Sequence, residues 1–403
     1  MSKRTYLLVL FLITFGFVKN AYTASFITND FILVVSFMWG FWGWRYYRTE
    51  ANNCLNTSEN RSIVWLLMSI MLLSLFIPYL KYDQSVVDAF FSQRYNYSIL
   101  ALLLLYRIHI SYGDLVFALR ICAYLSLICF VLSVFFPHLF VEQSVLMNIV
   151  DSRKQNLSTD IGYSAPGFSL MVFYLYIKIA ELLEQQSVKS LMECFVFVLY
   201  VILNQNRSTI IGTVPFFVFV LFFMKGEKKY FFWIIGAISV YPLFPYLLNI
   251  YDSLMSETQS QLGNVEYPRW QAIYVFLYEM KTNMIEYVIG SGVWSKTGAY
   301  SMTMTEMAMT RGAQISDIGW LGTFFYYGVM PIIILFKFVK KAIVGYCIPS
   351  FLKFYALWII FVPTIHCFLV NYISSNMLFV VFFYFITYFL TYKEEYKNIY
   401  IEN

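Results

Sequence analysis

Long apolar stretches separated by short polar turns recur along the whole chain. Stretches of about 17 to 25 apolar residues have the length that a helix needs to cross a bilayer. We therefore expect twelve transmembrane helices, at residues 5–23, 30–47, 62–81, 97–112, 116–136, 164–183, 190–204, 209–224, 230–249, 318–336, 354–371 and 375–392. The predicted fold class is an all-α polytopic integral membrane protein.

The predicted helices form a single membrane domain with one long loop. Residues 1–249 hold the first nine helices, residues 250–317 form the loop, and residues 318–403 hold the last three helices and a tail. The N-terminal segment MSKRTYLLVLFLITFGF also has the basic start and apolar run of a signal peptide. No small-x-small cleavage site precedes the next apolar stretch, which favours a retained first helix.

Lysine and arginine residues lie mostly on one side of this predicted topology. With the N-terminus inside, most of the 28 basic residues fall in cytoplasmic segments, among them the KGEKK turn and the FKFVKK segment. Cytoplasmic loops of membrane proteins carry such an excess. The pattern therefore predicts that both termini are cytoplasmic and that the long loop lies outside.

Composition narrows the classes of function. The chain of 403 residues is 60% hydrophobic and 13% charged, with a net charge of +5. In a membrane protein this charge reflects topology and anionic headgroups rather than nucleic acid. The six cysteines are scattered and only three histidines occur, so neither a disulfide framework nor a metal site is indicated. Nucleotide-binding glycine motifs and HExxH and GxSxG motifs are absent.

Besides the long loop, two other segments on the outer side of this topology place basic residues where a substrate could bind. The turn NQNRST, residues 204–209, sets Arg207 between Asn206 and Ser208 and between two apolar helices. Charged residues at such positions usually mark functional sites, although an arginine at a helix end also snorkels to the interface. The segment 137–163 carries Arg153 and Lys154, which are either substrate contacts or a solvated charge pair.

The long loop has an internal pattern of its own. After Pro268, apolar residues from Trp270 to Val288 recur at three- and four-residue spacing, which predicts an amphipathic helix on the membrane or on the helix bundle. This helix would act as a lid. It ends at IGSGVW, where Gly290 and Gly292 permit a tight turn or a close approach to a ligand. The stretch MTMTEMAMTRGAQ, which carries Arg311, is expected to be mobile.

Two residues at the ends of the ordered part of the loop have competing interpretations. Arg269 opens the predicted helix and either grips an anionic or hydroxyl-bearing substrate or pairs with Glu266. Asp317 stands where the loop returns to the membrane. It either caps the next helix or acts as a general base towards a sugar hydroxyl, and the two roles are compatible.

The ordered combination of these motifs resembles the superfamily of O-antigen and capsule polymerases (Wzy-type) and O-antigen ligases. The resemblance is carried by the NRS turn at Arg207, by RWQAI from Arg269, by IGSGV after it, and by SDIGWLGTFFYYGV where the loop returns to the membrane. These motifs cover about residues 200 to 330. The helical architecture is similar over most of the chain.

The resemblance implies a membrane glycosyltransferase of GT-C-like fold in the bacterial inner membrane, with its active site on the periplasmic face. Arg207 and Arg269 would bind the diphosphate of an undecaprenyl-diphosphate-linked sugar and stabilise its developing charge. No metal or other cofactor is expected. The implied partners are the lipid-linked donor and acceptor, membrane lipids and a chain-length regulator protein, but not nucleic acid. The residues that would line the substrate site are Asn206, Ser208, Arg153, Lys154, Gly290, Gly292 and Arg311.

Within this superfamily the sequence favours a polymerase. Ligases typically carry a His where the loop returns to the membrane, whereas this chain has Asp317 there and no His in residues 250–317. The expected function is transfer of a growing O-antigen chain from undecaprenyl diphosphate onto a new lipid-linked repeat unit, with Asp317 as the candidate base. The alternatives are an O-antigen ligase with lipid A core as acceptor, and a flippase for lipid-linked oligosaccharides, which should lack a single dominant outer loop.

A cysteine introduced at position 296 tests the predicted orientation. In a chain whose native cysteines are replaced, we expect it to react with a membrane-impermeant maleimide added to intact cells, because it lies in the outer loop. A cysteine in the KGEKK turn is the control and should react only after permeabilisation. Reaction at position 296 only after permeabilisation would invert the topology.

Overall fold

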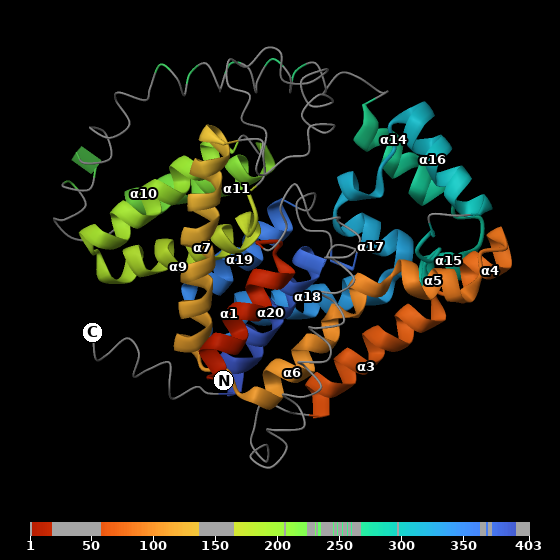
Figure 1. The fold of residues 1–403 in the computed structure, drawn as a ribbon, viewed down its shortest axis with the longest axis horizontal. Helices are drawn as coiled ribbons and strands as arrows, with labels where there is room; N and C mark the ends of the chain where they lie inside the picture. The colour runs from red at the N-terminus through yellow and green to blue at the C-terminus, as the bar shows by residue number, and fades with distance from the viewer. Residues whose placement is uncertain are drawn as a thin grey trace. The chain divides into compact units, whose positions relative to one another are not determined.

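The computed structural model describes residues 2–17, 58–136, 165–204, 207–223, 267–295, 298–362, 368–369 and 373–391, with single positions between 230 and 259. Every secondary-structure element assigned within these residues is helical (Figure 1). The all-α class is therefore confirmed for this part of the chain. The chain divides into two compact units, residues 1–3, 30–115 and 265–403 in unit 1 and residues 4–29 and 116–264 in unit 2.

Unit 2 contains a hairpin of two apolar helices, α9 and α10. Lys178 of α9 forms ion pairs with Glu181, at 2.7 Å, and with Glu193 of α10, at 3.1 Å. The rings of Tyr174 and Phe197 meet edge to face at 5.8 Å between the same two helices. The helices of this unit, two of which begin in unit 1, are α1 (Lys3–Thr14), α7 (Tyr112–Phe135), α9 (Phe168–Gln185), α10 (Val188–Leu203) and α11 (Arg207–Phe223).

Unit 1 is built around α20 (Ile373–Thr391), whose middle is buried on all sides. Aromatic rings fill this core, and those of Phe338 and Phe383 stack at 4.1 Å. The other elements are α3 (Ser58–Leu73), α4 (Phe76–Tyr82), α5 (Val86–Ser92), η2 (Arg94–Leu100), α6 (Ala101–Ile108), α14 (Pro268–Tyr274), η5 (Val275–Glu279), α15 (Met284–Ile289), α16 (Ala299–Arg311), η6 (Ile315–Ile318), α17 (Trp320–Tyr327), α18 (Val329–Val344) and α19 (Ser350–Phe361).

Three helical stretches among the described residues are long and apolar enough to cross a membrane. They are Ser62–Tyr82, Tyr112–Ser133 and Ser374–Thr391, and two shorter apolar helices are Thr209–Phe222 and Ser350–Phe361. These stretches are consistent with a helical membrane protein, although they do not establish twelve spans. The predicted helix at 30–47, nearly all of the one at 230–249, and the outer segment 137–163 lie outside the described residues.

Several predicted helices are divided in the structure. The helix expected at 318–336 is broken at Gly328 into α17 and α18, because this glycine has a positive φ of 73° that a helix does not accommodate. The helix expected at 97–112 begins as the 3₁₀ segment η2 and ends before His109, which has a φ of 51°. The helix expected at 62–81 is interrupted between α3 and α4.

The long loop also differs from its prediction in two ways. The amphipathic helix expected from Trp270 to Val288 is not continuous, since it consists of α14, the π-helical turn η5 and the separate α15. The stretch expected to be mobile instead forms α16 over most of its length, ended by Gly312 in the left-handed conformation. Met, Glu and Ala are good helix formers, and the glycine provides the stop signal.

A buried hydrogen-bond network holds α17 within unit 1. The Tyr327 hydroxyl donates to Gln93 Oε1 at 2.9 Å and accepts from Asn96 Nδ2 at 2.6 Å. Asn376 of α20 donates through Nδ2 to Asn96 Oδ1 at 2.9 Å. Because buried amides and hydroxyls are costly without partners, this network fixes the orientation of α17 between η2 and α20.

Residues 288–292 of the loop lie directly against residues 325–328 at the end of α17. Two backbone N–H groups of the first segment, those of Ser291 and Gly292, donate to carbonyl oxygens of the second at 2.7 and 2.9 Å. We call these two segments the glycine junction. It attaches the loop to the helix through the backbone, so its geometry does not depend on side-chain rotamers.

The junction requires glycine on both sides. Gly290 has a φ of 83°, and a Cβ atom there would lie 2.1 Å from the carbonyl oxygen of Tyr326. A Cβ atom at Gly328 would lie 2.1 Å from the carbonyl oxygen of Val288. Both distances are far below van der Waals contact with backbone atoms that cannot move away separately.

Substituting Gly328→Ala tests the junction. The variant combines an unfavourable φ with a backbone clash, so we expect a loss of about 2 to 4 kcal/mol and a clearly lower midpoint of thermal unfolding in detergent. Gly298→Ala is the matched control, because Gly298 has a φ of 92° but open space around a Cβ atom. Equal losses in the two variants would show that close approach contributes nothing.

Candidate functional site

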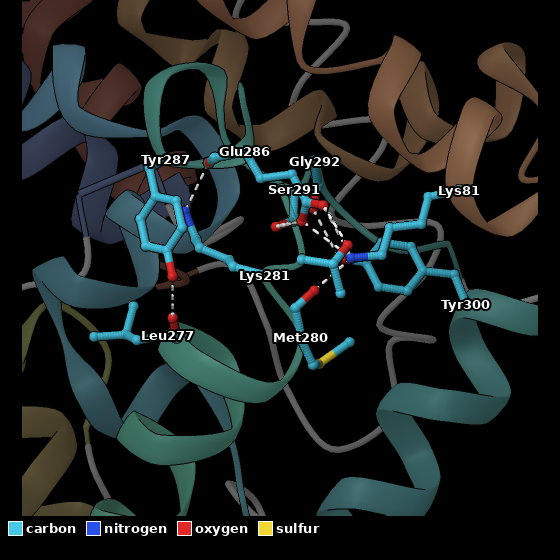
Figure 2. Close-up of polar contacts among 10 residues, drawn as sticks. Lys81, Leu277, Met280, Lys281, Glu286, Tyr287, Ser291, Gly292 and Tyr300 are labelled. Atoms are coloured by element: carbon cyan, nitrogen blue, oxygen red, sulfur yellow. Dashed lines mark hydrogen bonds and ion pairs between the residues drawn. The ribbon is translucent and has the colours of Figure 1, made fainter. Parts of the chain in front are cut away.

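A buried ionic cluster fixes the loop to the end of the candidate span Ser62–Tyr82. Figure 2 shows Lys81 and Lys281 on opposite sides of Glu286, which lies at the start of α15. Lys81 Nζ lies 3.0 and 3.1 Å from the two carboxylate oxygens of Glu286. Lys81 Nζ also donates to the carbonyl oxygen of Met280. Lys81 therefore links α4 to two points of the loop at once.

The Glu286 carboxylate has further donors within the loop itself. Thr282 Oγ1 donates to Oε1 at 3.2 Å, and Ser291 Oγ donates to Oε2 at 3.1 Å. The side chain of Glu286 is only 4% exposed. A buried carboxylate is tolerated when opposite charge and hydrogen-bond donors surround it, and here both are present.

Lys281 is buried beneath the same cluster but does not contact the carboxylate. Its Nζ donates to the carbonyl oxygens of Glu286, at 2.7 Å, and of Phe324, at 3.3 Å, and lies 4.2 Å from the centre of the Phe324 ring. The pKa of Lys281 is lowered from 10.5 to about 8, chiefly because the amine is buried; Glu286 opposes this shift and Lys81 adds to it. The amine remains mainly protonated at pH 7, so the cluster contains two cations and one anion.

Two further contacts dock the loop beside this cluster. The ring of Tyr300 stacks on that of Tyr82 with 4.1 Å between centroids and a 1° angle between planes. Gln84 accepts from the backbone N–H of Ser295 at 2.8 Å and donates to the carbonyl oxygen of Val293 at 3.0 Å. The segment from residue 280 to residue 300 is thus attached to α4, to the residues that follow it and to α17. This arrangement positions the loop, since the polar groups of the cluster already bind one another.

The described basic candidates of the loop have different surroundings. Arg311 lies at the end of α16 and forms a two-pronged ion pair with Glu279, at 2.7 and 2.8 Å. Arg269 is exposed at the start of α14, and its guanidinium lies 6.0 Å from the ring centre of Tyr267. Among the described residues, no carboxylate pairs with Arg269. Glu266, the other partner expected for Arg269, lies outside the described residues, whereas the cation of Arg311 is neutralised by Glu279.

The backbone structure shows where three other candidate site residues of the loop lie. Gly290 and Gly292 belong to the glycine junction; Gly290 permits close approach to the backbone of Tyr326, whereas Gly292 permits close approach to Pro78 of α4 and to the Ser74 carbonyl. Asp317 lies in η6, and the N-cap of α17 is Gly319, two residues further on. The N-cap position itself is therefore not that of Asp317.

The remaining candidates belong to unit 2 or lie outside the described residues. Arg207 and Ser208 form the first turn of α11, directly after the turn that was expected to present them. Asn206, Arg153 and Lys154 lie outside the described residues. Arg207 and Arg269 thus fall in different units of the chain.

Sequence analysis did not single out Lys81, Lys281 or Glu286. Lys81 stood at the end of a predicted span, where a snorkelling lysine is ordinary. Lys281 and Glu286 are five residues apart, so they do not share one face of a regular helix. The available signal was a lysine and a glutamate within the apolar pattern of the predicted loop helix.

No group of His, Cys, Asp or Glu side chains among the described residues is arranged to hold a metal ion. Comparison of the chain with protein-family models, curated proteins and solved structures gives no match. The function of the chain is therefore inferred from its sequence motifs and from the geometry of the described residues.

Substituting Glu286→Gln tests whether the cluster stabilises the docked loop. Removing the anion leaves the half-buried Lys81 and the buried Lys281 without their shared counter-charge, and breaking a buried ion pair costs about 3 kcal/mol or more. We expect a lower midpoint of thermal unfolding. Glu279→Gln is the control, because it removes the exposed partner of Arg311 and should leave the midpoint nearly unchanged. Similar midpoints for both variants would contradict a stabilising role of the cluster.

Proposed function

We propose that this protein is a membrane glycosyltransferase that polymerises surface polysaccharide from undecaprenyl-diphosphate-linked repeat units. The growing glycan on its lipid carrier is the donor, and the non-reducing sugar of a new lipid-linked repeat unit is the acceptor. The reaction takes place on the outer face of the bacterial inner membrane, with both termini of the chain in the cytoplasm.

In this proposal an acceptor hydroxyl attacks the anomeric carbon of the donor sugar. A glycosidic C–O bond forms, the bond between the anomeric carbon and the diphosphate oxygen breaks, and undecaprenyl diphosphate leaves. Arg207 and Arg269 bind the diphosphate and stabilise the negative charge that develops as it departs. Asp317 accepts the proton of the attacking hydroxyl.

The observation that supports the proposal is a folded loop that carries an exposed arginine, with no carboxylate partner for it among the described residues. A loop of this length with internal order is typical of binding elements. The described part of the loop is attached to α4 and α17, and it presents Arg269 exposed, without a carboxylate partner among the described residues. A planar guanidinium suits the paired oxygens of a diphosphate. Arg311 is the weaker candidate for binding the diphosphate, because its guanidinium already pairs with Glu279.

The class of activity is tested by deleting the gene and examining the surface polysaccharide on a gel. Loss of a polymerase leaves a single repeat unit on the lipid A core. Loss of a ligase leaves no repeat unit on the core, while lipid-linked chains persist. Loss of a flippase leaves neither. Only the first pattern agrees with the proposal.

The roles of the two arginines are tested in the deletion strain complemented with variants. Because each guanidinium is proposed to stabilise charge in the transition state, Arg207→Ala and Arg269→Ala should each reduce long-chain polymer by about a hundredfold or more while the protein still inserts.

Arg94→Ala is the matched control for these variants. Arg94 also lies on the outer side of the predicted topology and contacts a neighbouring tyrosine ring, at 4.6 Å, but it has no proposed substrate role. Chain length should stay normal in this control. Normal chain length in the Arg207 variant would remove Arg207 from the site, and the same result for Arg269 would remove that residue.

A further inference from the structure

The short helix α15 has an apolar exposed face and a charged buried one. Met284, Ile285 and Val288 are 82%, 57% and 52% exposed. The single charged residue of α15, Glu286, instead points inward to Lys81. This distribution is the reverse of what water favours, since large apolar side chains face outward and the carboxylate is buried.

The apolar face of α15 continues onto α18. The backbones of Val288 and Gly328 are in direct contact at the glycine junction, and Val329 follows at once. From Val329 the exposed side of α18 continues through Ile333 and Phe336. In the predicted topology α18 belongs to a membrane span, and its exposed apolar stripe therefore faces lipid. The exposed residues of α15 therefore lie close to the start of this stripe, at the glycine junction.

The position of α15 along the membrane normal follows from its ion pair. Lys81 is the penultimate residue of the candidate span Ser62–Tyr82, and it binds Glu286 directly. A lysine at the end of a span lies near the boundary between hydrocarbon and headgroups. Glu286, and with it α15, therefore lies at the edge of the bilayer.

The other helices of the loop have a different surface. On α16 the exposed Met302 and Met309 are interleaved with exposed Glu306 and Arg311. On α14 and η5, exposed Arg269 and Glu279 flank the exposed rings of Trp270, Tyr274 and Tyr278. Charged side chains spread over an exposed face, as on α16, are typical of water-facing surfaces. Of these helices, α15 has exposed apolar side chains but no exposed charged one.

We propose that α15 is immersed in the outer edge of the bilayer, with Met284, Ile285 and Val288 in contact with lipid acyl chains. The long outer loop would then leave the membrane, return to it at α15, and leave it again before α16. The occupant of the apolar face is lipid, because α15 is bound to Lys81 at the end of a candidate span and lies beside the exposed apolar side of α18. This inference goes beyond the proposed function and does not depend on it.

Two methionines provide a matched test. Met284 and Met309 are both 82% exposed, one on α15 and the other on α16. In the full-length protein without native cysteines, Met284→Cys and Met309→Cys each receive a nitroxide spin label in lipid vesicles. Collision rates are measured with oxygen, which concentrates in lipid, and with a nickel chelate, which stays in water.

We expect the ratio of oxygen to nickel collisions to be several times higher at position 284 than at position 309. Ile285→Cys provides a second position on the same face and should behave like 284. Equal ratios at 284 and 309 would overturn the proposal, because α15 would then face water. Protection of 284 from both reagents would overturn it too, since another protein surface rather than lipid would cover the face.

Discussion

The ion pair between the buried carboxylate of Glu286 and Lys81 is the interaction on which the arrangement of the long loop depends. The carboxylate is held by Lys81 from a candidate membrane span and by Thr282 and Ser291 from the loop itself. Taking such a group out of water is unfavourable unless every partner is present. Separating the loop from α4 is therefore unfavourable at its first step, because that step would leave the buried carboxylate without its lysine partner.

This constraint changes the view of the loop as a lid. The segment from Met280 to Tyr300 is attached by ions at Glu286, by an aromatic stack at Tyr300, and by backbone hydrogen bonds at the glycine junction. A segment attached at so many points is a fixed part of unit 1 rather than a lid that opens and closes. In the proposed enzyme its role is to hold Arg269 and the return to α17 in place, so that the charges facing the substrate are preorganised.

The sequence predicted helical class and the approximate position of most described helices, because apolar runs of spanning length are a strong signal. It did not predict the breaks. Gly328 is one residue in an otherwise apolar run, and its positive φ becomes necessary only because Val288, forty residues earlier, lies against it. Contacts between segments that are far apart in the chain do not produce a periodic pattern of apolar residues in either segment.

The same limit applies to the candidate site. The sequence alone does not distinguish Arg269 from Arg311, since both are arginines in the polar loop. Only the fold places Glu279 beside Arg311. Periodicity correctly grouped Trp270, Met284, Ile285 and Val288 as apolar positions of the loop, yet all four are exposed. Phe276 and Met280 of the same predicted face are buried, and the π-helical turn at η5 and the interruption of the helix before α15 separate them from the exposed residues. Local spacing predicts which residues belong together but not which side they face.

The distance along the chain between Lys81 and Glu286 has a consequence for the biosynthesis and folding of the protein. These residues are 205 positions apart, and most of unit 2, residues 116–264, is translated between them. During synthesis from the N-terminus, Lys81 therefore has no Glu286 to pair with until the ribosome has passed residue 286. The intervening unit can assemble meanwhile from its own consecutive helices. Completion of unit 1 is consequently a late event in the biosynthesis of the protein.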